Sequence, residues 1–148
     1  MNVPIPDLDD AVLARLRADG QRYTSARRAL VRVLEGAERP LAMHELLGEN
    51  AELAQSSTYR NLALLERVGV VHRIATGDDF GRYELAEDLT DHHHHHLICR
   101  RCGSVDDFEV SPQLERTLAR AFAAVTTATG FQADHHRLDL VGTCHRCD

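Results

Sequence analysis

The sequence predicts an α+β protein that has an N-terminal winged helix-turn-helix domain and a small C-terminal α/β domain with a four-cysteine zinc site. Three observations support this: periodic helical segments followed by a hairpin signal, a final helix flanked by strands, and two Cys-x-x-Cys pairs. The 148 residues, 43% of them hydrophobic, suffice for one ordinary domain or two small ones. We expect residues 1–86 to form the first domain, 87–91 a linker and 92–148 the second domain.

Helices are expected throughout most of the first domain, because apolar residues recur there at helical spacing. Glycine or a capping hydroxyl marks several ends: Thr24 can cap the second helix, and Gly69 stops the fourth. The expected helices cover residues 8–18, 24–35, a short stretch after Pro40, and 58–68 with Ser56 or Ser57 as its cap.

A β-hairpin is expected after the fourth helix. Two short runs, residues 70–75 and 82–86, flank the turn sequence Thr-Gly-Asp-Asp-Phe-Gly. Helices followed by a hairpin are typical of the winged helix-turn-helix, whose last helix enters the major groove of DNA. This order of elements is not unique to DNA-binding proteins, so the side chains of the last helix must support the assignment.

The second domain is expected to combine short strands with one long helix. Ser111-Pro112 is a strong helix start, and the helix continues to about Thr129 before Gly130. The expected strands cover residues 94–99, 105–108 and 137–141. A domain of about 60 residues is small enough for an internal metal ion to contribute strongly to folding.

The four cysteines form two pairs, and each pair brings two thiolates to one point. Two such pairs make a closed tetrahedral sulfur site, which is typical of structural zinc. In a reducing cytoplasm these residues are metal ligands rather than disulfides, and buried free thiols are the less favoured alternative. We therefore predict a structural Zn²⁺ held by Cys99, Cys102, Cys144 and Cys147.

Five consecutive histidines, residues 92–96, directly precede the first cysteine pair. In an extended strand successive side chains point to opposite faces, so His94 and His96 share one face while His93 and His95 share the other. One strand could therefore supply paired imidazoles to two metal sites. A solvated histidine loop is the alternative, whereas an affinity tag is disfavoured because tags stand at chain termini.

The distribution of charge favours DNA more than the net charge of −6 does, since six arginines between positions 15 and 32 accompany a single aspartate. Such a run can also be a solvated helix face. At the start of the fourth helix Arg60 can pair with guanine and Tyr59 can contact a thymine methyl, although Tyr59 could instead be core. The candidate contacts to double-stranded DNA are Arg22, Arg27, Arg28, Ser57, Thr58, Tyr59 and Arg60.

Several classes of protein are disfavoured. No apolar run is long enough to span a membrane, and the acidic start is no signal peptide, so we expect a cytoplasmic protein without a membrane partner. A hydrolytic zinc enzyme needs an open coordination position, and neither HExxH nor a deaminase signature occurs. We expect no enzyme and no small-molecule substrate other than metal ions. A zinc-ribbon interaction protein or a metal-storage protein would explain the ligands but not the winged helix.

Together these features resemble the ferric uptake regulator (Fur) superfamily of metal-dependent repressors over nearly the whole chain. The segments that carry the resemblance are residues 20–27, the Ser-Thr-Tyr-Arg segment 57–62, the histidine and cysteine segment 92–103, and the ending 136–147. The resemblance implies a homodimer, formed through a C-terminal dimerisation domain, with a regulatory metal at the hinge between the two domains.

The resemblance also implies which residues hold further metal ions. The regulatory site would use His72, Glu84, His94 and His96. A second regulatory site, on the other strand face, would use His93, His95, Glu115 and His136. Both glutamates could instead be ordinary exposed carboxylates.

Within the superfamily the chain is most similar to the zinc uptake regulator (Zur) branch, because His72 follows the entry to the wing. Arg39 stands where iron and peroxide sensors usually have a histidine, yet the zinc-sensor cysteine near Ala86 is absent and Glu84 matches the iron type. We expect a repressor of metal-uptake genes that binds operator DNA when Zn²⁺ occupies the hinge site. An iron(II)-dependent repressor is the alternative, and Mn²⁺ or Ni²⁺ also suit these ligands.

Overall fold

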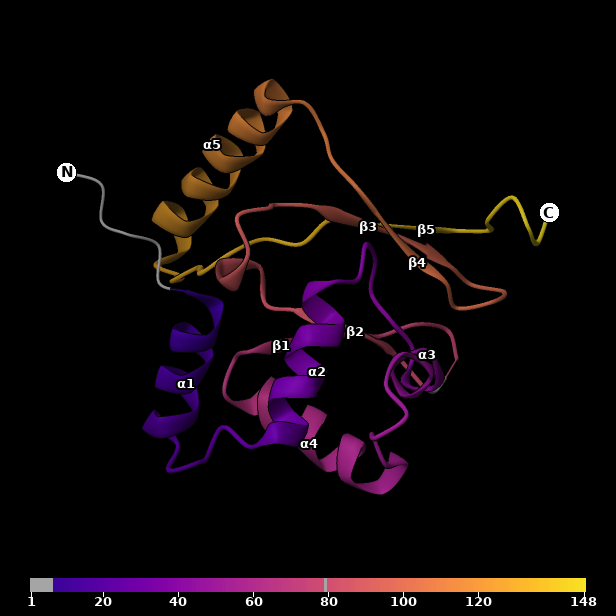
Figure 1. Cartoon of the computed structure of the whole chain (residues 1–148). Coiled ribbons are helices and arrows are strands. Elements are labelled where there is room, and N and C mark those ends of the chain that lie inside the picture. Colours follow the sequence, from indigo (N-terminus) through magenta and orange to yellow (C-terminus); the bar gives the residue numbers. More distant parts are fainter. Residues whose placement is uncertain (1–6, 79) are drawn as a thin grey trace.

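The computed structural model describes residues 7–78 and 80–148 (Figure 1). Residues 1–6 of the predicted first domain and Asp79 of the predicted turn lie outside the described residues. The first part of the chain contains α1 (Leu8–Ala18), α2 (Ser25–Glu35), α3 (Met43–Glu49), α4 (Gln55–Arg67), β1 (Val71–Ile74) and β2 (Arg82–Leu85). The second part contains the 3₁₀ turn η1 (Glu87–Leu89), β3 (His95–Cys99), β4 (Val105–Phe108), α5 (Pro112–Thr129) and β5 (Asp139–Gly142).

The helices α1–α4 and the β1–β2 hairpin share one hydrophobic core, as expected of a winged helix. The amphipathic α2 buries Leu30 and Leu34, and the Thr24 hydroxyl caps it by accepting a hydrogen bond from the backbone N–H of Arg27. β1 and β2 are antiparallel, and the inward-facing Tyr83 and Leu85 of β2 belong to the same core. The hairpin is therefore packed on the helices along one of its faces.

The predicted start of the fourth helix is wrong by about one turn. α4 begins at Gln55 with Ala54 at its N-cap, and the Thr58 N–H already donates to the Ala54 carbonyl at 2.9 Å. The Ser57 hydroxyl donates back to the same carbonyl at 3.1 Å and therefore does not cap the helix. The helix therefore begins with the Ala54 carbonyl as its first acceptor and without a capping side chain.

The second sheet has the strand order β4-β3-β5, in which β3 is antiparallel to β4 and parallel to β5. The predicted elements are present with shifted ends: β3 begins at His95, and β5 covers Asp139–Gly142. α5 begins as predicted, because the Ser111 hydroxyl accepts a hydrogen bond from the Leu114 N–H and Pro112 occupies the first turn. The linker at 87–91 stays a prediction, and η1 occupies part of it.

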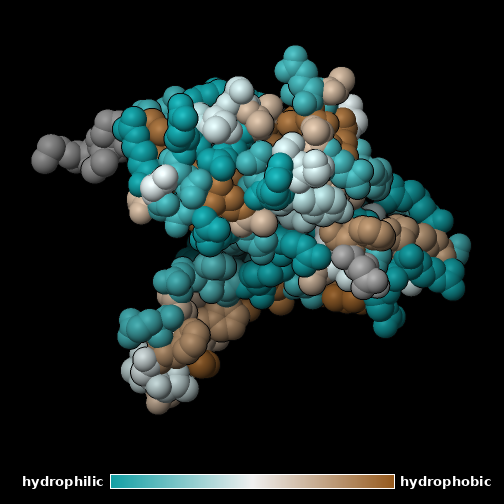
Figure 2. Space-filling model, turned by 90° about the horizontal axis from the view of Figure 1, so that it is seen from below, coloured by the Kyte–Doolittle hydropathy of each residue, from teal (hydrophilic) through white to brown (hydrophobic). Residues whose placement is uncertain are grey.

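α5 is exposed along its length. Its residues, all of which the structure describes, are exposed or half-buried. Figure 2 shows apolar surface on the lobe that α5 forms beside the body of the molecule. Large exposed hydrophobic side chains of α5, the following loop and β5 are Leu114, Phe122, Val125, Phe131, Leu140 and Val141.

The two parts of the chain meet along the hairpin. Ile74 of β1 packs with Ile98 of β3 and Val105 of β4 in a small second core. The hairpin thus lies between the helical domain and the second sheet, as Figure 1 shows. Among the described residues, no helix combines the length and the apolarity needed to cross a bilayer.

Candidate metal centres and nucleic-acid interface

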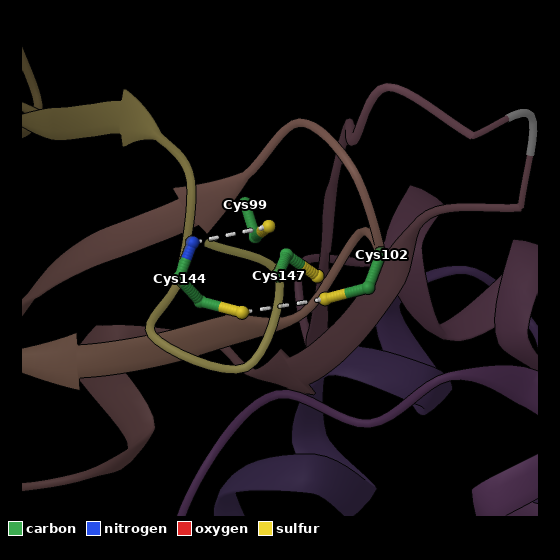
Figure 3. Close-up of side chains that lie close together, drawn as sticks. All are labelled: Cys99, Cys102, Cys144 and Cys147. Carbon is green, nitrogen blue, oxygen red and sulfur yellow. Dashed lines mark hydrogen bonds between the residues drawn. The ribbon is translucent and has the colours of Figure 1, made fainter.

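The cysteines converge where β3 ends and the chain leaves β5 (Figure 3). The sulfur atoms of Cys99, Cys102, Cys144 and Cys147, here the four-cysteine cluster, all lie within 4.8 Å of one another. The Cys102 and Cys144 sulfurs are 3.8 Å apart, and none of the four cysteines forms a disulfide. Four Zn–S bonds of about 2.3 Å in a tetrahedron place sulfur atoms about 3.8 Å apart. The geometry therefore suits tetrahedral zinc.

Local backbone geometry prepares the four-cysteine cluster for a metal. The parallel pairing of β3 with β5 places Cys99 opposite Gly142, which brings the two cysteine pairs together. Backbone hydrogen bonds at Cys102 and Cys144 lower the pKa of the Cys99 thiol to about 6. The Cys144 N–H lies 3.3 Å from the Cys99 sulfur. Because the thiolate is the form that binds metal, these donors favour ligation.

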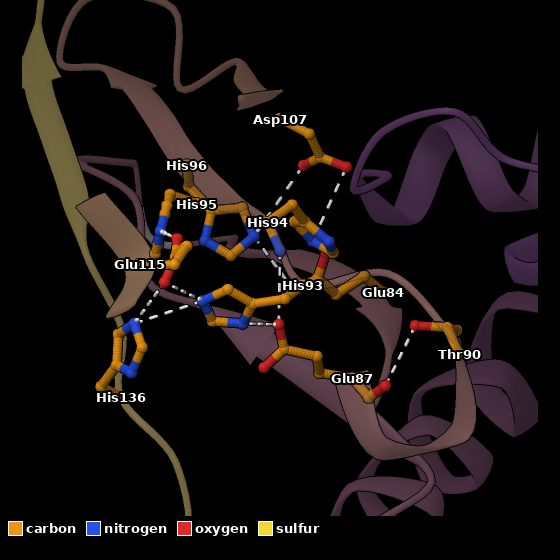
Figure 4. Close-up of polar contacts among 10 residues, drawn as sticks. All are labelled: Glu84, Glu87, Thr90, His93, His94, His95, His96, Asp107, Glu115 and His136. Carbon is orange, nitrogen blue, oxygen red and sulfur yellow. Dashed lines mark hydrogen bonds and ion pairs between the residues drawn. The ribbon is translucent and has the colours of Figure 1, made fainter. Parts of the chain in front are cut away.

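A second group of ligands joins the hairpin to the second sheet (Figure 4). This bridging cluster consists of Glu84, His94, His96 and Asp107. The two Glu84 carboxylate oxygens lie 2.9 Å from His94 Nε2 and 3.1 Å from His96 Nε2. The Asp107 carboxylate stands 3.7 Å from His94 Nε2 and 3.9 Å from His96 Nε2. Two imidazoles and two carboxylates thus converge from β2, from β3 and the residue before it, and from β4.

The bridging cluster is electrostatically coupled. Burial raises the pKa of Glu84, but hydrogen bonds to His94 and His96 outweigh it and bring the pKa down to about 2. The hydrogen bond to Glu84 raises the pKa of His94 to about 9. On its other ring nitrogen His96 lies 3.3 Å from the Asp139 carboxylate, and such a partner orients an imidazole ligand.

His72, which the resemblance implied as a ligand of this site, lies outside the bridging cluster. It stands opposite Glu84 in the hairpin register, but its ring packs beside that of His135 with a centroid distance of 5.6 Å. Asp107 completes the cluster instead. The sequence signal for Asp107 is its place on β4 directly opposite His96, a register that becomes known only with the β3–β4 pairing.

The opposite face of β3 carries a third group of ligands. His93, His95, Glu115 and His136, here the α5 cluster, offer ligand atoms within 4.8 Å of one another. His95 Nε2 lies 2.5 Å from one Glu115 oxygen, and His93 Nε2 lies 3.2 Å from the other. The Nε2 atoms of His93 and His136 are 3.2 Å apart. The ligands come from β3, its N-terminal end, α5 and the segment before β5, so the α5 cluster lies within the second domain.

A cleft of about 690 Å³ opens beside the bridging cluster. Its lining includes Glu84, His94 and Asp107, and also Arg39 from the segment before α3. The Arg39 guanidinium forms an ion pair with Glu45, and the hydrogen bond to Glu45 raises the pKa of Arg39. The cluster is thus accessible to ions from solvent, and the cationic side chain of Arg39 lines the same cleft.

The start of α4 presents part of the predicted DNA-contacting set. Tyr59 is 40% exposed and Arg60 is exposed, whereas Leu62 is buried. Thr58 is only 1% exposed, and its hydroxyl has no hydrogen-bond partner within the described part of the chain. The structure therefore corrects the assignment of Thr58, whose side chain faces the domain interior. Ser57 is half-buried and bonded to its own helix.

The predicted basic residues differ in what they already bind. Arg22 is exposed, while Arg27 donates from Nε to the Asn61 side-chain oxygen at 3.0 Å and so connects α2 to α4. Arg28 forms a 2.8 Å ion pair with Asp9. Arg27 and Arg28 are thus held within the helical domain. If either guanidinium contacted DNA, it would have to do so while bonded to Asn61 or Asp9.

Comparisons with known proteins agree with this architecture. Residues 18–141 match the model of the ferric uptake regulator family. The chain is 33% identical over 144 residues to the ferric uptake regulation protein of Bacillus subtilis (strain 168), across 94% of this chain and 93% of the relative. The solved ferric uptake regulator Fur of Helicobacter pylori superposes with a TM-score of 0.68 at 26% identity, covering 97% of this chain and 95% of that one. A zinc-bound manganese uptake regulator superposes with a TM-score of 0.59 at 31% identity, covering 90% of this chain and 98% of that one.

Proposed function

Since the chain belongs to the ferric uptake regulator family of metal-responsive transcriptional regulators, we propose that it is a zinc-dependent repressor that binds operator DNA as a homodimer. The observation that carries the proposal is the contact of Glu84, from β2 of the winged helix, with His94 and His96 in the second domain. A metal ion held by these ligands would connect the two domains directly. Its targets would be metal-uptake genes, and the protein would act in the cytoplasm.

The proposed mechanism is a shift in the population of domain orientations. Without metal, the two winged helices of a dimer sample several orientations, and few of these match two half-sites on one face of DNA. Glu84, His94 and His96 would hold a metal between the two domains, and such a bridge would select the matching orientation. Removing a conformational penalty of about 3 kcal/mol would tighten DNA binding on the order of a hundredfold.

The donor chemistry supports zinc as the regulatory ion. Imidazole nitrogen and carboxylate oxygen in four-coordinate geometry are common zinc ligands, and the four-cysteine cluster suits a separate structural zinc ion. The zinc-bound manganese uptake regulator among the similar structures is consistent with zinc in this fold. Iron(II) is the main alternative, because imidazole with carboxylate also suits it, as well as Mn²⁺ or Ni²⁺. The α5 cluster would hold a further regulatory ion.

The exposed apolar face of α5 and β5 supports a homodimer. Phe122, Val125 and Val141 are 38%, 57% and 58% exposed in the single chain. Several large apolar side chains exposed on one small domain indicate a protein interface. A second copy of the chain would cover this surface and place two winged helices on one DNA duplex.

The proposed DNA interface is centred on the first turns of α4. Arg60 and Tyr59 would contact base edges, and Arg22 and Ser57 would contact phosphates. Arg27 and Arg28 are weaker members, because each already has a partner within the helical domain. Phosphate contacts from arginine make the affinity strongly salt-dependent.

Fluorescence anisotropy with metal-buffered solutions tests the proposal. The full-length protein is titrated onto a fragment from a zinc-uptake promoter of the source genome at fixed free Zn²⁺, Fe²⁺, Mn²⁺ or Ni²⁺. We expect binding at far lower free Zn²⁺ than for the other ions, with Glu84→Gln losing the response. If DNA binding required Fe²⁺ rather than Zn²⁺, metal-dependent repression would stand, and zinc would be rejected as the regulatory ion. A flat response to all four ions would reject metal-dependent repression and leave a zinc-ribbon or storage role.

A further inference from the structure

The outer face of β2 makes two separate contacts with the second domain. Side chains alternate along a strand, so Tyr83 and Leu85 face the helical core while Arg82 and Glu84 face the other way. Glu84 belongs to the bridging cluster. Arg82 reaches the turn at residues 99–103, here called the first knuckle, which carries the first pair of the four-cysteine cluster.

Arg82 is buried and its guanidinium is fixed by several partners. The side chain is 7% exposed, and its Nη1 and Nη2 atoms lie 3.2 and 3.0 Å from the two Asp78 carboxylate oxygens. Nη1 also donates to the Gly81 carbonyl at 2.8 Å, and Nη2 donates to the Cys102 carbonyl at 3.4 Å. The bidentate pair with Asp78 holds the guanidinium plane, which leaves one N–H directed at the knuckle.

The hairpin turn also fits closely against the first knuckle. A Cβ atom on Gly103 would stand 2.5 Å from the Asp78 carboxylate and 2.7 Å from Arg82 Nη2. A Cβ atom on Gly77 would stand 3.3 Å from the Arg100 carbonyl oxygen. No side chain fits at Gly103 without displacing the Arg82–Asp78 pair, so the knuckle backbone and this pair are in direct contact.

We propose that Arg82 is a positioning residue that fixes the orientation of the winged helix against the zinc knuckle. The state of the four-cysteine cluster thereby contributes to DNA binding in addition to folding. Cys102 would hold zinc through its sulfur, and this ligation would fix the knuckle backbone and with it the carbonyl to which Arg82 donates. When the knuckle is loose, the buried guanidinium loses this acceptor, and the hairpin loses its second anchor beside the bridging cluster.

The test compares Arg82→Gln with Arg73→Gln in the full-length, zinc-loaded protein. Arg73 is the matched control, because it is an exposed residue of the same hairpin and its replacement removes the same charge. Asp78→Asn is measured in parallel, since it weakens the pair from its more exposed end. The readouts are zinc content, hydrogen exchange at residues 71–85 and 99–104, and operator affinity at several salt concentrations.

We expect Arg82→Gln and Asp78→Asn to keep the zinc of the four-cysteine cluster. Their backbone amides should exchange hydrogen faster than those of wild type at residues 71–85 and 99–104, whereas those of Arg73→Gln should not. Operator affinity at saturating zinc should fall about tenfold for Arg82→Gln with an unchanged salt slope, because a buried arginine makes no phosphate contact. If Arg82→Gln had the same hydrogen exchange and the same operator affinity as Arg73→Gln, the inference would be overturned.

The affinity readout rests on the proposed function, whereas the exchange readout does not. If the wild-type protein failed to bind the operator while both variants exchanged faster, the proposed function would fail and the positioning role of Arg82 would stand. Slow exchange in both variants, with normal DNA binding, would reject the positioning role alone.

Discussion

The bridging cluster and the α5 cluster use the same strand and nearly the same ligands, but they connect different parts of the molecule. Each takes alternate histidines from the same run and adds a glutamate. In the bridging cluster the glutamate, Glu84, comes from β2 of the winged helix. In the α5 cluster the glutamate, Glu115, comes from the helix of the second domain itself.

This difference indicates that the role of each site depends on which element supplies its glutamate, β2 or α5, rather than on the chemistry of the ligands. A metal in the bridging cluster would restrict how the DNA-binding domain sits on the second domain. A metal in the α5 cluster would attach α5 to the second sheet and leave the winged helix unaffected. Only the first site is therefore expected to control DNA binding strongly.

Replacing Cys102 by Ser should have the largest effect, because it removes the scaffold that both clusters share. Zinc binding contributes on the order of 10 kcal/mol to the folding of zinc-finger peptides. We expect loss of bound zinc, loss of the dimer and unfolding of the second domain, measured by zinc content, sedimentation and circular dichroism. His145→Ala, between the second pair of cysteines, is the control and should remain folded. A folded, dimeric Cys102→Ser protein would show that the bridging cluster and the α5 cluster do not need the four-cysteine cluster as their scaffold.

Replacing Glu84 by Gln should separate the two clusters most clearly. The change removes the charge that connects β2 to His94 and His96 while keeping the side-chain shape. We expect operator affinity at saturating zinc to fall on the order of a hundredfold, the full effect of the conformational penalty of about 3 kcal/mol. Anisotropy titration measures the loss, and an affinity within twofold of wild type would contradict the bridging role.

Replacing Arg60 by Ala should weaken DNA binding without changing either cluster. One bidentate contact to a base contributes about 1–3 kcal/mol of discrimination, so we expect specific affinity to fall by roughly tenfold to a hundredfold. Zinc content and the zinc concentration needed for the response should stay unchanged. A reduced preference for operator over scrambled DNA is the expected result, whereas an unchanged operator preference would remove Arg60 from the interface.

Replacing Glu115 by Gln should have the smallest effect on DNA binding. The change matches Glu84→Gln chemically but lies in the α5 cluster, where Glu115 contacts His95 and His93. We expect less metal bound per chain and a lower melting temperature, with operator affinity within about threefold of wild type. Metal analysis, calorimetry and anisotropy give these three values. If Glu115→Gln lost as much operator affinity as Glu84→Gln, the two clusters would contribute equally to DNA binding, and the proposed difference between them would be contradicted.

Much of this arrangement could be predicted from sequence, since it follows from local geometry. Alternation along a strand separates His94 and His96 from His93 and His95 whatever the surroundings, and the structure places them on opposite faces. The start of α5 was equally predictable, because Ser111-Pro112 determines it locally.

The rest depends on contacts between distant segments. Asp107 joins the bridging cluster through the β3–β4 register, and His72 leaves it to pack beside His135, a residue far along the chain. The burial of Thr58 likewise depends on how α4 turns toward the core, which the Ser-Thr-Tyr-Arg pattern does not specify. These features are tertiary, and no periodicity in the sequence encodes them.

The central claim is that metal in the bridging cluster fixes the orientation of the winged helices. The most direct test is a pulsed electron–electron distance measurement between spin labels on the two chains of the dimer, attached at the exposed position Ala51 through a non-cysteine chemistry. We predict a broad distance distribution without regulatory zinc, a narrow one with zinc, and a broad one for Glu84→Gln in both conditions. A wild-type distribution that zinc does not change, or a narrow one in Glu84→Gln, would contradict the claim.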